Sequence, residues 1–161
     1  MSSSKSRIVV AAACAGLSFM MEVSVLSRMV IAQQSPQINF PPVAEGCQAL
    51  KEVTTQQTTI RKTIKRGDEN TGFAVPTGQD FQSFTVQMIP ENTANYELAV
   101  DFKYSDGSTA QVFSKKAYLQ RLKLDSLSLR SPNSKQPYQV NLQVRGPRDN
   151  VYNVLVQACS K

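Results

Sequence analysis

Large apolar and polar side chains alternate along the second half of the chain, which is the pattern of β-strands with one buried face. From Asn95 to Tyr104 the even positions carry Tyr, Leu, Val, Phe and Tyr, and the odd positions are mostly polar. Residues 84–88, 138–145 and 152–158 show the same alternation. Successive side chains of a strand point to opposite faces. The pattern therefore predicts four strands, each with one face toward a core.

Residues that favour turns separate these segments. Residues 105–108 (Ser-Asp-Gly-Ser) precede a short strand-like run at 109–113, and an Asp-Gly pair supplies the positive φ angles that a tight hairpin needs. Proline, asparagine or glycine also interrupts the chain at 90–92, 131–134 and 146–150. Strands broken at intervals of about 8–15 residues predict an all-β fold, an antiparallel β-sandwich that is immunoglobulin-like or similar, with about seven to nine strands.

Two segments fit more than one structure. Residues 49–66 have a helical apolar face, but they also contain five threonines, which favour a strand. We interpret this segment as one short helical turn near 48–53 followed by a strand to about residue 66. Between 117 and 129 the alternation changes phase. Either a β-bulge or a helical turn at 117–122 before a strand accounts for this change.

The first 32 residues have the composition of a targeting segment. Lys5 and Arg7 precede an apolar run at 8–21, and Ala32 ends a Val-Ile-Ala sequence that suits signal-peptide cleavage. We interpret residues 1–32 as a secretory signal peptide. The domain organisation then comprises an extended, Pro- and Gln-rich lead-in at 33–46 and a single β-sandwich domain at 47–161.

An uncleaved N-terminal membrane anchor across residues 8–32 is the alternative. Glu22 and Arg28 oppose it, because a charge at the centre of a spanning helix costs about 2.5–3.5 kcal/mol. A lipoprotein would use Cys14, but three alanines precede it where a lipid-attachment sequence usually has a leucine. The remainder of the chain is exported under all three interpretations.

Composition excludes several classes of protein. The 161 residues are 41% hydrophobic and 19% charged, with 7 Gly and 8 Pro, which suits one globular domain and excludes collagen-like, coiled-coil and low-complexity chains. The formal net charge of +6 is compatible with an anionic partner. It is too weak for a dedicated nucleic-acid-binding protein, and we expect no nucleic acid as a partner.

Two cysteines, Cys47 and Cys159, remain after the first 32 residues. An even number of cysteines in an exported chain indicates a disulfide. This disulfide would join the start of the domain to its last strand. Two free thiols are the alternative if the compartment is reducing. Two cysteines without any histidine make a poor metal site, and we expect no metal and no cofactor.

The absence of histidine removes the commonest general base and excludes Ser-His and Cys-His nucleophiles. Carboxylates are the remaining candidates for catalysis. Glu97 and Asp101 share one strand face but stand about 13 Å apart along it, more than glycoside hydrolysis uses. Folding could add Asp80, Glu91 or Asp125. We interpret these groups as solvated charges, and Asp106 as a turn residue.

Aromatic side chains are candidates for a sugar platform. Four of the five tyrosines, at 96, 104, 138 and 152, lie in the apolar phase of the predicted strands, which favours a core position over an exposed one. Tyr118 is the fifth. Phe73, Phe81 and Phe113 are free of this pattern and could lie at the end of a sheet.

The densest cluster of charge is basic and comprises Arg61, Lys62, Lys65 and Arg66. Lysine and arginine often protect an exposed strand edge, which is one interpretation of the cluster. The other is a patch for an anionic polymer, lipid headgroup or acidic protein. The sequence Arg66-Gly67-Asp68 matches integrin-binding loops, but so short a match arises readily by chance.

These features together predict an exported, non-catalytic β-sandwich that acts as a binding or structural module at the cell envelope or outside the cell, in a periplasmic or extracellular location. The expected partner is a protein or an anionic envelope component, with membrane contact only through residues 8–32 if these stay uncleaved. Two alternatives remain. One is an exported hydrolase that uses carboxylates alone, and the other is a soluble-side subunit of a membrane complex.

Overall fold

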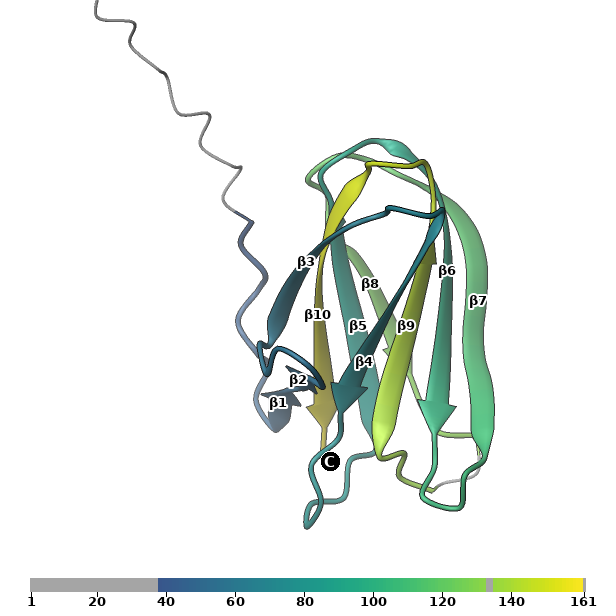
Figure 1. Ribbon diagram of the computed structural model, residues 1–161. Coiled ribbons are helices and arrows are strands. Elements are labelled where there is room, and N and C mark those ends of the chain that lie inside the picture. Colours follow the sequence, from purple (N-terminus) through teal and green to yellow (C-terminus); the bar gives the residue numbers. More distant parts are fainter. Residues whose placement is uncertain (1–37, 133–134, 161) are drawn as a thin grey trace, which may run out of the picture. The chain divides into compact units, whose positions relative to one another are not determined.

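The structure, a computed structural model, describes residues 38–132 and 135–160, which form ten strands and no helix. The predicted signal or anchor segment lies outside the described residues. Two antiparallel sheets face each other (Figure 1), so the predicted all-β sandwich is confirmed. The first sheet contains β1 (Cys47–Ala49), β3 (Thr59–Thr63), β5 (Ser83–Pro90), β8 (Asp125–Leu129) and β10 (Val151–Cys159). The second contains β2 (Lys51–Glu52), β4 (Asp68–Ala74), β6 (Ala94–Lys103), β7 (Thr109–Leu119) and β9 (Gln139–Arg145).

The order of the strands is that of a jelly roll. In the first sheet β10 lies between β5 and the pair β1 and β3, which pair with different parts of its other edge, and β8 follows β5. The second sheet has the order β2-β4-β9-β6-β7. From β3 onward, consecutive strands change sheets except in the β6–β7 hairpin, an arrangement typical of jelly rolls and not of immunoglobulin domains. The structure has more strands than the predicted seven to nine because the count includes β1 and β2, which are too short to leave an alternating pattern in the sequence.

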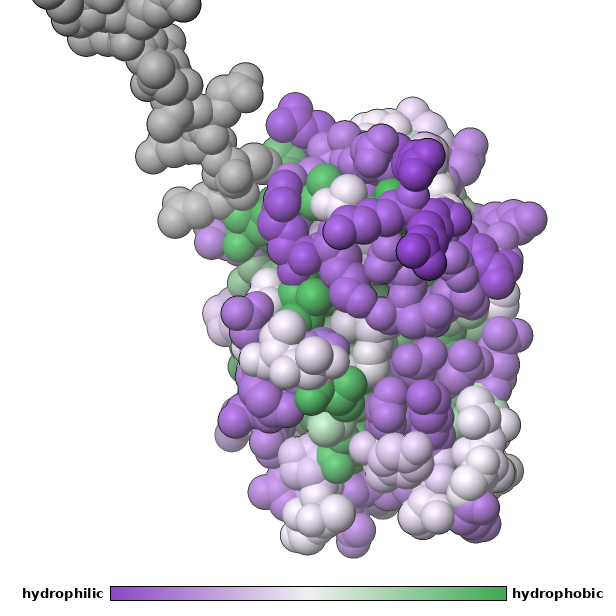
Figure 2. Space-filling model, viewed as in Figure 1, coloured by the Kyte–Doolittle hydropathy of each residue, from purple (hydrophilic) through white to green (hydrophobic). Residues whose placement is uncertain are grey.

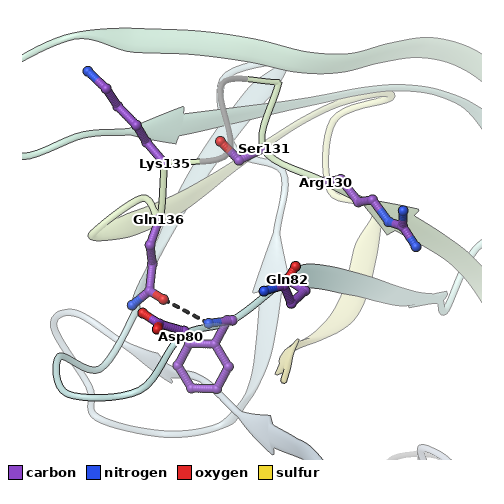
Figure 3. A pocket seen from close by; sticks show the side chains of 7 residues that line it. Asp80, Gln82, Arg130, Ser131, Lys135 and Gln136 are labelled. Carbon is purple, nitrogen blue, oxygen red and sulfur yellow. Dashed lines mark hydrogen bonds between the residues drawn. The ribbon is translucent and has the colours of Figure 1, made fainter. Parts of the chain in front are cut away.

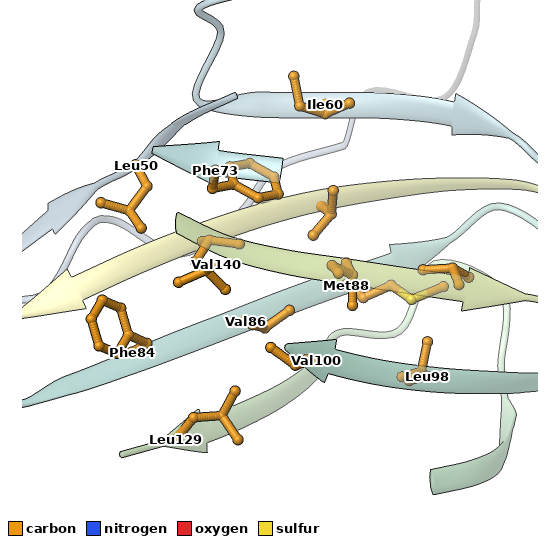
Figure 4. Packing of buried hydrophobic residues seen from close by; sticks show 14 of the residues in the cluster. Leu50, Ile60, Phe73, Phe84, Val86, Met88, Leu98, Val100, Leu129 and Val140 are labelled. Carbon is orange, nitrogen blue, oxygen red and sulfur yellow. The ribbon is translucent and has the colours of Figure 1, made fainter. Parts of the chain in front are cut away.

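The core fills the space between the sheets and comes from the alternating positions. Phe84 and Val86 of β5 point toward Val100 of β6 and Val140 of β9 (Figure 4). The rings of Phe84 and Phe102 meet edge to face with their centroids 4.9 Å apart. The four strands predicted from period-two alternation are therefore confirmed as β5, β6, β9 and β10.

The segment at 48–53 is strand and turn, so the predicted short helix is wrong. Leu50 lies between β1 and β2 and is fully buried, which fixes the chain across the end of the sandwich. Glu52 then organises a turn, because its carboxylate accepts hydrogen bonds from the N–H groups of Thr54 and Thr55 at 3.0 and 2.6 Å. Burial of one leucine and capping of one turn outweigh the helical periodicity.

The phase change between 117 and 129 also has a different cause from the two that we considered. β7 runs without a helical turn to Leu119, and a reversal at 120–124 leads into β8. Leu122 has a φ of 58° in this reversal, and its N–H donates to the carbonyl of Pro90. The alternation therefore restarts in a new strand of the other sheet.

The strand β10 is buried on both faces, although its sequence predicts mainly one buried face. Asn153, Leu155 and Gln157 on the outer side are at most 5% exposed. The lead-in reaches this outer side, because Ile38 and Asn39 form a small pocket with Ile89 and Leu122. A central strand with a segment of chain beside its outer face has less contact with water than the pattern alone indicates.

Cys47 and Cys159 form the predicted disulfide. The two residues are direct partners in the β1–β10 register, and their Cα atoms are 4.0 Å apart. The bond closes a loop with a sequence separation of 112 residues. On the other side of β10, Cys159 is the register partner of Ser83, so the disulfide lies beside the start of β5.

Two buried tyrosines of the core differ in how their hydroxyl groups are satisfied. Tyr96 donates to the carbonyl of Asn92 at 2.9 Å and accepts from Asn150 at 3.1 Å. The hydroxyl of Tyr152 and the nearby hydroxyl of Thr71 are buried without hydrogen-bond geometry to any group. Burial raises the pKa of Tyr152.

We expect Tyr152→Phe to leave the free energy of unfolding within about 1 kcal/mol of the parent, on the stabilising side, because it removes a buried unpaired hydroxyl. The matched change Tyr96→Phe should lower it by about 1 kcal/mol, since two hydrogen bonds are lost. Urea unfolding of both variants measures the difference. Equal losses in the two variants would contradict the assignment of the Tyr152 hydroxyl as unpaired.

Candidate functional site

A polar pocket opens at the end of the sandwich where β8 ends and β5 begins, and we call it the end pocket. It has a volume of about 460 Å³. One side comes from residues 80–82 before β5, and the other from Arg130, Ser131, Lys135 and Gln136 between β8 and β9 (Figure 3). Binding sites are typically concave and about 300–1,000 Å³ in volume. The end pocket therefore has the size of a site for a small ligand or one unit of a polymer.

Hydrogen bonds between loops hold the end pocket in shape. The side chain of Gln136 accepts from the N–H of Phe81 at 2.8 Å and donates to the carbonyl of Pro76 at 3.2 Å. The hydroxyl groups of Ser131 and Tyr104 are 2.8 Å apart, which ties the end of β8 to the end of β6. Both walls are thus fixed to the strands before any ligand arrives, and such preorganisation reduces the cost of binding.

Several polar groups of the end pocket are free to bind. Among the described residues, the side chains of Asp80, Gln82 and Arg130 have no hydrogen-bond or ion-pair partner. Arg130 and Lys135 extend in opposite directions at the rim (Figure 3), and Lys135 pairs with Asp106 at 3.2 Å. The lining of the pocket thus includes a carboxylate and amides, with the guanidinium of Arg130 at the rim and the buried Phe81 beside Asp80.

Asp106 belongs to the β6–β7 hairpin, as we predicted from the Asp-Gly pair. Its carboxylate accepts from the N–H of Ser108 at 2.9 Å and from the Ser108 hydroxyl at 2.5 Å, and Gly107 has a φ of 81°. The Ser108 hydroxyl and N–H, with the Lys135 ammonium, lower the pKa of Asp106 to about 2. Asp106 therefore carries a negative charge beside the pocket at every physiological pH.

The carboxylates that could support hydrolysis are spread over the surface. Asp80 is the one carboxylate that lines the end pocket. Glu97 lies on the outer face of the second sheet between Lys116 and Arg145, at 3.6 and 3.7 Å. Each described pocket is lined by one carboxylate at most. A pair flanking one bond, which glycoside hydrolysis requires, is not formed in these pockets.

The basic cluster of the sequence does not form one patch in the structure. Arg61 makes a bidentate ion pair with Glu91, at 2.7 and 2.8 Å. Lys62, on the opposite side of β3, donates to the carbonyl of Asn70. Lys65 and Arg66 lie in the β3–β4 turn, where they form a shallow hollow with Arg148. Neighbouring residues of a strand point to opposite faces, which divides the cluster.

The tyrosines also divide. Tyr96, Tyr104 and Tyr152 are buried, as predicted. Tyr138 is 48% exposed, so its predicted core position is wrong, because it precedes β9 at the end of the sandwich, beyond the packed layers. Tyr118 is 65% exposed on β7. Phe73 and Phe81 are buried and Phe113 is half-buried.

Charged and amide side chains cover much of the outer face of the second sheet. Figure 2 shows mostly hydrophilic side chains over β9 and β6. Asp68, Arg145, Glu97 and Lys116 are successive register partners across four strands, so their charges alternate in sign. These exposed charges balance one another, and the outer face of this sheet is a solvated surface without a net charge along that row.

The edge strand β7 is protected against the addition of another strand. Lys115 is the register partner of Leu98, whose side chain is in the core, yet Lys115 itself is exposed. The pairing of β6 and β7 also shifts between Val100 and Asp101. An inward-facing lysine and a bulge are two devices by which proteins prevent strand-to-strand association. This edge does not favour assembly through β7.

Within residues 38–132 and 135–160, no group of three or more His, Cys, Asp or Glu side chains could hold a metal ion. The same residues contain no helix that is long and apolar enough to cross a membrane.

No family model and no curated protein matches this chain. Solved structures with a similar arrangement of strands include AlgX of Pseudomonas aeruginosa, with 11% identity and a TM-score of 0.44, where the match covers 66% of this chain and 28% of that chain. A variant of a family 29 carbohydrate-binding module has 10% identity, a TM-score of 0.44 and coverage of 76% and 87%. The family 32 module of AlyQ, solved with 4,5-unsaturated mannuronic acid, has 9% identity, a TM-score of 0.41 and coverage of 79% and 100%. These values show a likeness in fold alone.

Proposed function

We propose that this chain is an exported, non-catalytic β-sandwich module that binds one unit of a hydroxyl-rich ligand, such as an envelope polysaccharide, in the end pocket. The observation that carries the proposal is a preformed pocket in which Asp80, Gln82 and Arg130 leave hydrogen-bonding groups unpaired among the described residues. Carboxylate and amide oxygens accept hydrogen bonds from hydroxyl groups, and amide and guanidinium N–H groups donate to them. A sugar unit offers both kinds of partner.

The polar character of the end pocket favours a saccharide over an apolar ligand. Its side chains are polar except for that of Phe81, a residue that is 8% exposed and supplies a small apolar part of the lining. Gln136 and Ser131 are occupied in holding the walls, so the ligand is left with the free groups of the rim. The pocket thus separates into a fixed frame and a free set of binding groups.

Export is supported by the disulfide, since disulfides persist in oxidising compartments outside the cytosol. Binding without catalysis is supported by the single carboxylate of the end pocket. The hydrolase alternative would need a second carboxyl group about 5–10 Å from Asp80 across the ligand. The next carboxylate of this end, Asp106, is held by Ser108 and Lys135 outside the pocket lining.

The test is calorimetric titration of the protein with soluble polysaccharides, some neutral and some containing uronate. We expect binding to at least one of them, and an affinity at least tenfold lower for the double variant Asp80→Asn with Gln82→Ala. Both side chains are exposed, so the fold should be unaffected. The matched control carries the same two changes on the outer face of the second sheet, Asp101→Asn with Gln111→Ala, and should bind like the parent.

Binding that is unchanged in the end-pocket variant would refute this site, and failure to bind any polysaccharide would refute the ligand class. Release of new reducing ends during the titration would instead establish the hydrolase alternative.

A further inference from the structure

The end of the sandwich opposite the end pocket consists of four turns, residues 64–67, 90–93, 120–124 and 146–150, which we call the cationic end. The four turns gather at the top of the view in Figure 1. They are tied together by hydrogen bonds from Arg121 N–H to the Thr93 hydroxyl, from Leu122 N–H to the Pro90 carbonyl and from Asp149 N–H to the Ile64 carbonyl. The cationic end is thus one connected surface.

Two leucines project from the cationic end into water. Leu122 and Leu124 are 45% and 43% exposed. Leu122 also has a φ of 58°, a conformation that asparagine or glycine adopts with less strain. Neither leucine belongs to the hydrophobic core or to the partly buried residues packed against it. Strain of this kind is often retained where a residue takes part in binding.

Basic residues surround these leucines. Arg121 and Lys123 alternate with them along the β7–β8 turn, and Lys65, Arg66 and Arg148 line the hollow in the neighbouring turns. Among the described residues none of the five forms an ion pair. The carboxylates of this end include Glu91, which already holds Arg61, and also Asp149, Asp68 and Glu69.

The opposite end lacks this excess of positive charge. There the turns carry the basic residues Arg130 and Lys135 and the acidic residues Asp80 and Asp106, and Lys135 is paired with Asp106. The turns at the two ends of the sandwich therefore differ in charge.

The chain also enters the domain beside the cationic end. Ile38 and Asn39, the first described residues, share a pocket with Ile89 and Leu122. The described part of the chain therefore begins next to Leu122.

We infer that the cationic end docks on the surface of a membrane that contains anionic lipids, with Leu122 and Leu124 inserted between headgroups. A lipid interface offers both partners that this surface needs, apolar chains for the leucines and phosphate groups for the cations. An acidic polysaccharide would satisfy the cations alone. In this orientation the end pocket faces away from the membrane.

The experiment uses the chain beginning at residue 33, so that the predicted signal or anchor segment cannot bind lipid. This chain keeps all ten strands and the whole core. Sedimentation with phosphatidylcholine vesicles is compared with sedimentation with vesicles that contain about one third phosphatidylglycerol, at low and high salt. We expect binding only to the anionic vesicles, and its loss at high salt.

Two double variants test the two parts of the surface. Arg121→Gln with Lys123→Gln, and Leu122→Asn with Leu124→Ser, should each weaken vesicle binding at least fivefold. Asparagine suits the positive φ at 122, so the turn is kept. The control Lys51→Gln with Lys103→Gln removes the same charge away from this end and should change binding less than twofold.

Insertion is measured directly with one added tryptophan, because the chain contains none. The emission of Leu124→Trp should shift to shorter wavelength with anionic vesicles, and that of Tyr138→Trp, at the other end, should not. Equal binding to neutral vesicles, parent-like binding of both double variants, or an unshifted Leu124→Trp spectrum would each overturn the inference. Binding to an acidic polysaccharide through Arg121 and Lys123, without vesicle binding, would also overturn it.

Discussion

Replacing both Cys47 and Cys159 by alanine should lower the free energy of unfolding by about 4–5 kcal/mol. The disulfide spans a sequence separation of 112 residues, and a cross-link of that length removes much of the conformational entropy of the unfolded chain. Because single domains have only about 5–15 kcal/mol of stability, this loss would leave the protein close to unfolding at 37 °C.

Urea unfolding of the chain beginning at residue 33, in which these are the only cysteines, measures this effect. The oxidised parent, the reduced parent and the double-alanine variant should rank in that order or with the last two equal. A difference of less than about 1 kcal/mol between the oxidised parent and the variant would contradict the entropic argument. Replacing the two cysteines should also weaken ligand binding in the end pocket. The N–H of Gln82 donates to the carbonyl of Cys159, and this hydrogen bond positions the rim of the pocket.

Glu91→Gln should lower the free energy of unfolding by about 2 kcal/mol at pH 7, since three charge-assisted hydrogen bonds are weakened together. The Glu91 side chain is 9% exposed, and its carboxylate accepts from Arg61 twice, at 2.7 and 2.8 Å, and from Asn153 at 2.8 Å. Glu97→Gln is the control. Glu97 is 34% exposed with partners at 3.6 and 3.7 Å, and the change should cost less than about 0.5 kcal/mol.

The contribution of Glu91 depends on pH in a definite direction. The hydrogen bonds from Arg61 lower the pKa of Glu91 below its usual value of 4.5. A group whose pKa is lowered by folding stabilises the native state fully above its unfolded pKa, and the stabilisation is lost as the pH falls through the folded pKa. The difference between the parent and Glu91→Gln should therefore be constant from pH 6 to 8 and shrink below about pH 4.5. A difference that grows on acidification would refute the ion pair.

Much of the fold could be predicted because β-strands leave a local signal. The alternation from Asn95 to Tyr104 depends only on which side chains follow one another, and it locates β6 within one residue at each end. The hairpin at 105–108 could be predicted for the same reason, since Asp106 and Gly107 form their turn with near neighbours. The disulfide could be predicted because only two cysteines, Cys47 and Cys159, lie outside the targeting segment.

The predictions that failed concern contacts between distant residues. The helical turn at 48–53 is wrong because Leu50 is needed in the core and β1 pairs with β10, more than 100 residues later. Tyr138 shares the phase of β9 but stands beyond the packed layers, so its period-two position did not bury it. Arg61 finds its partner Glu91 thirty residues along the chain. These contacts join residues that are far apart in the sequence, so no local sequence pattern could indicate them.

The sequence gives little indication of the candidate sites. The end pocket joins Asp80 and Gln82 to residues about fifty positions later, and each of these is an ordinary polar loop residue by itself. The alternation around Leu122 and Leu124 resembles that of a strand, but in the structure both residues lie in a turn and are exposed.

By itself the sequence determined an all-β domain, the places of its main strands and turns, and the cysteine pair that closes it. The tertiary structure alone decided the jelly-roll order, the separation of the basic cluster and the two dissimilar ends. The physical reason is that side-chain alternation acts between adjacent residues, whereas strand register and loop assembly depend on which surfaces meet when the chain closes on itself.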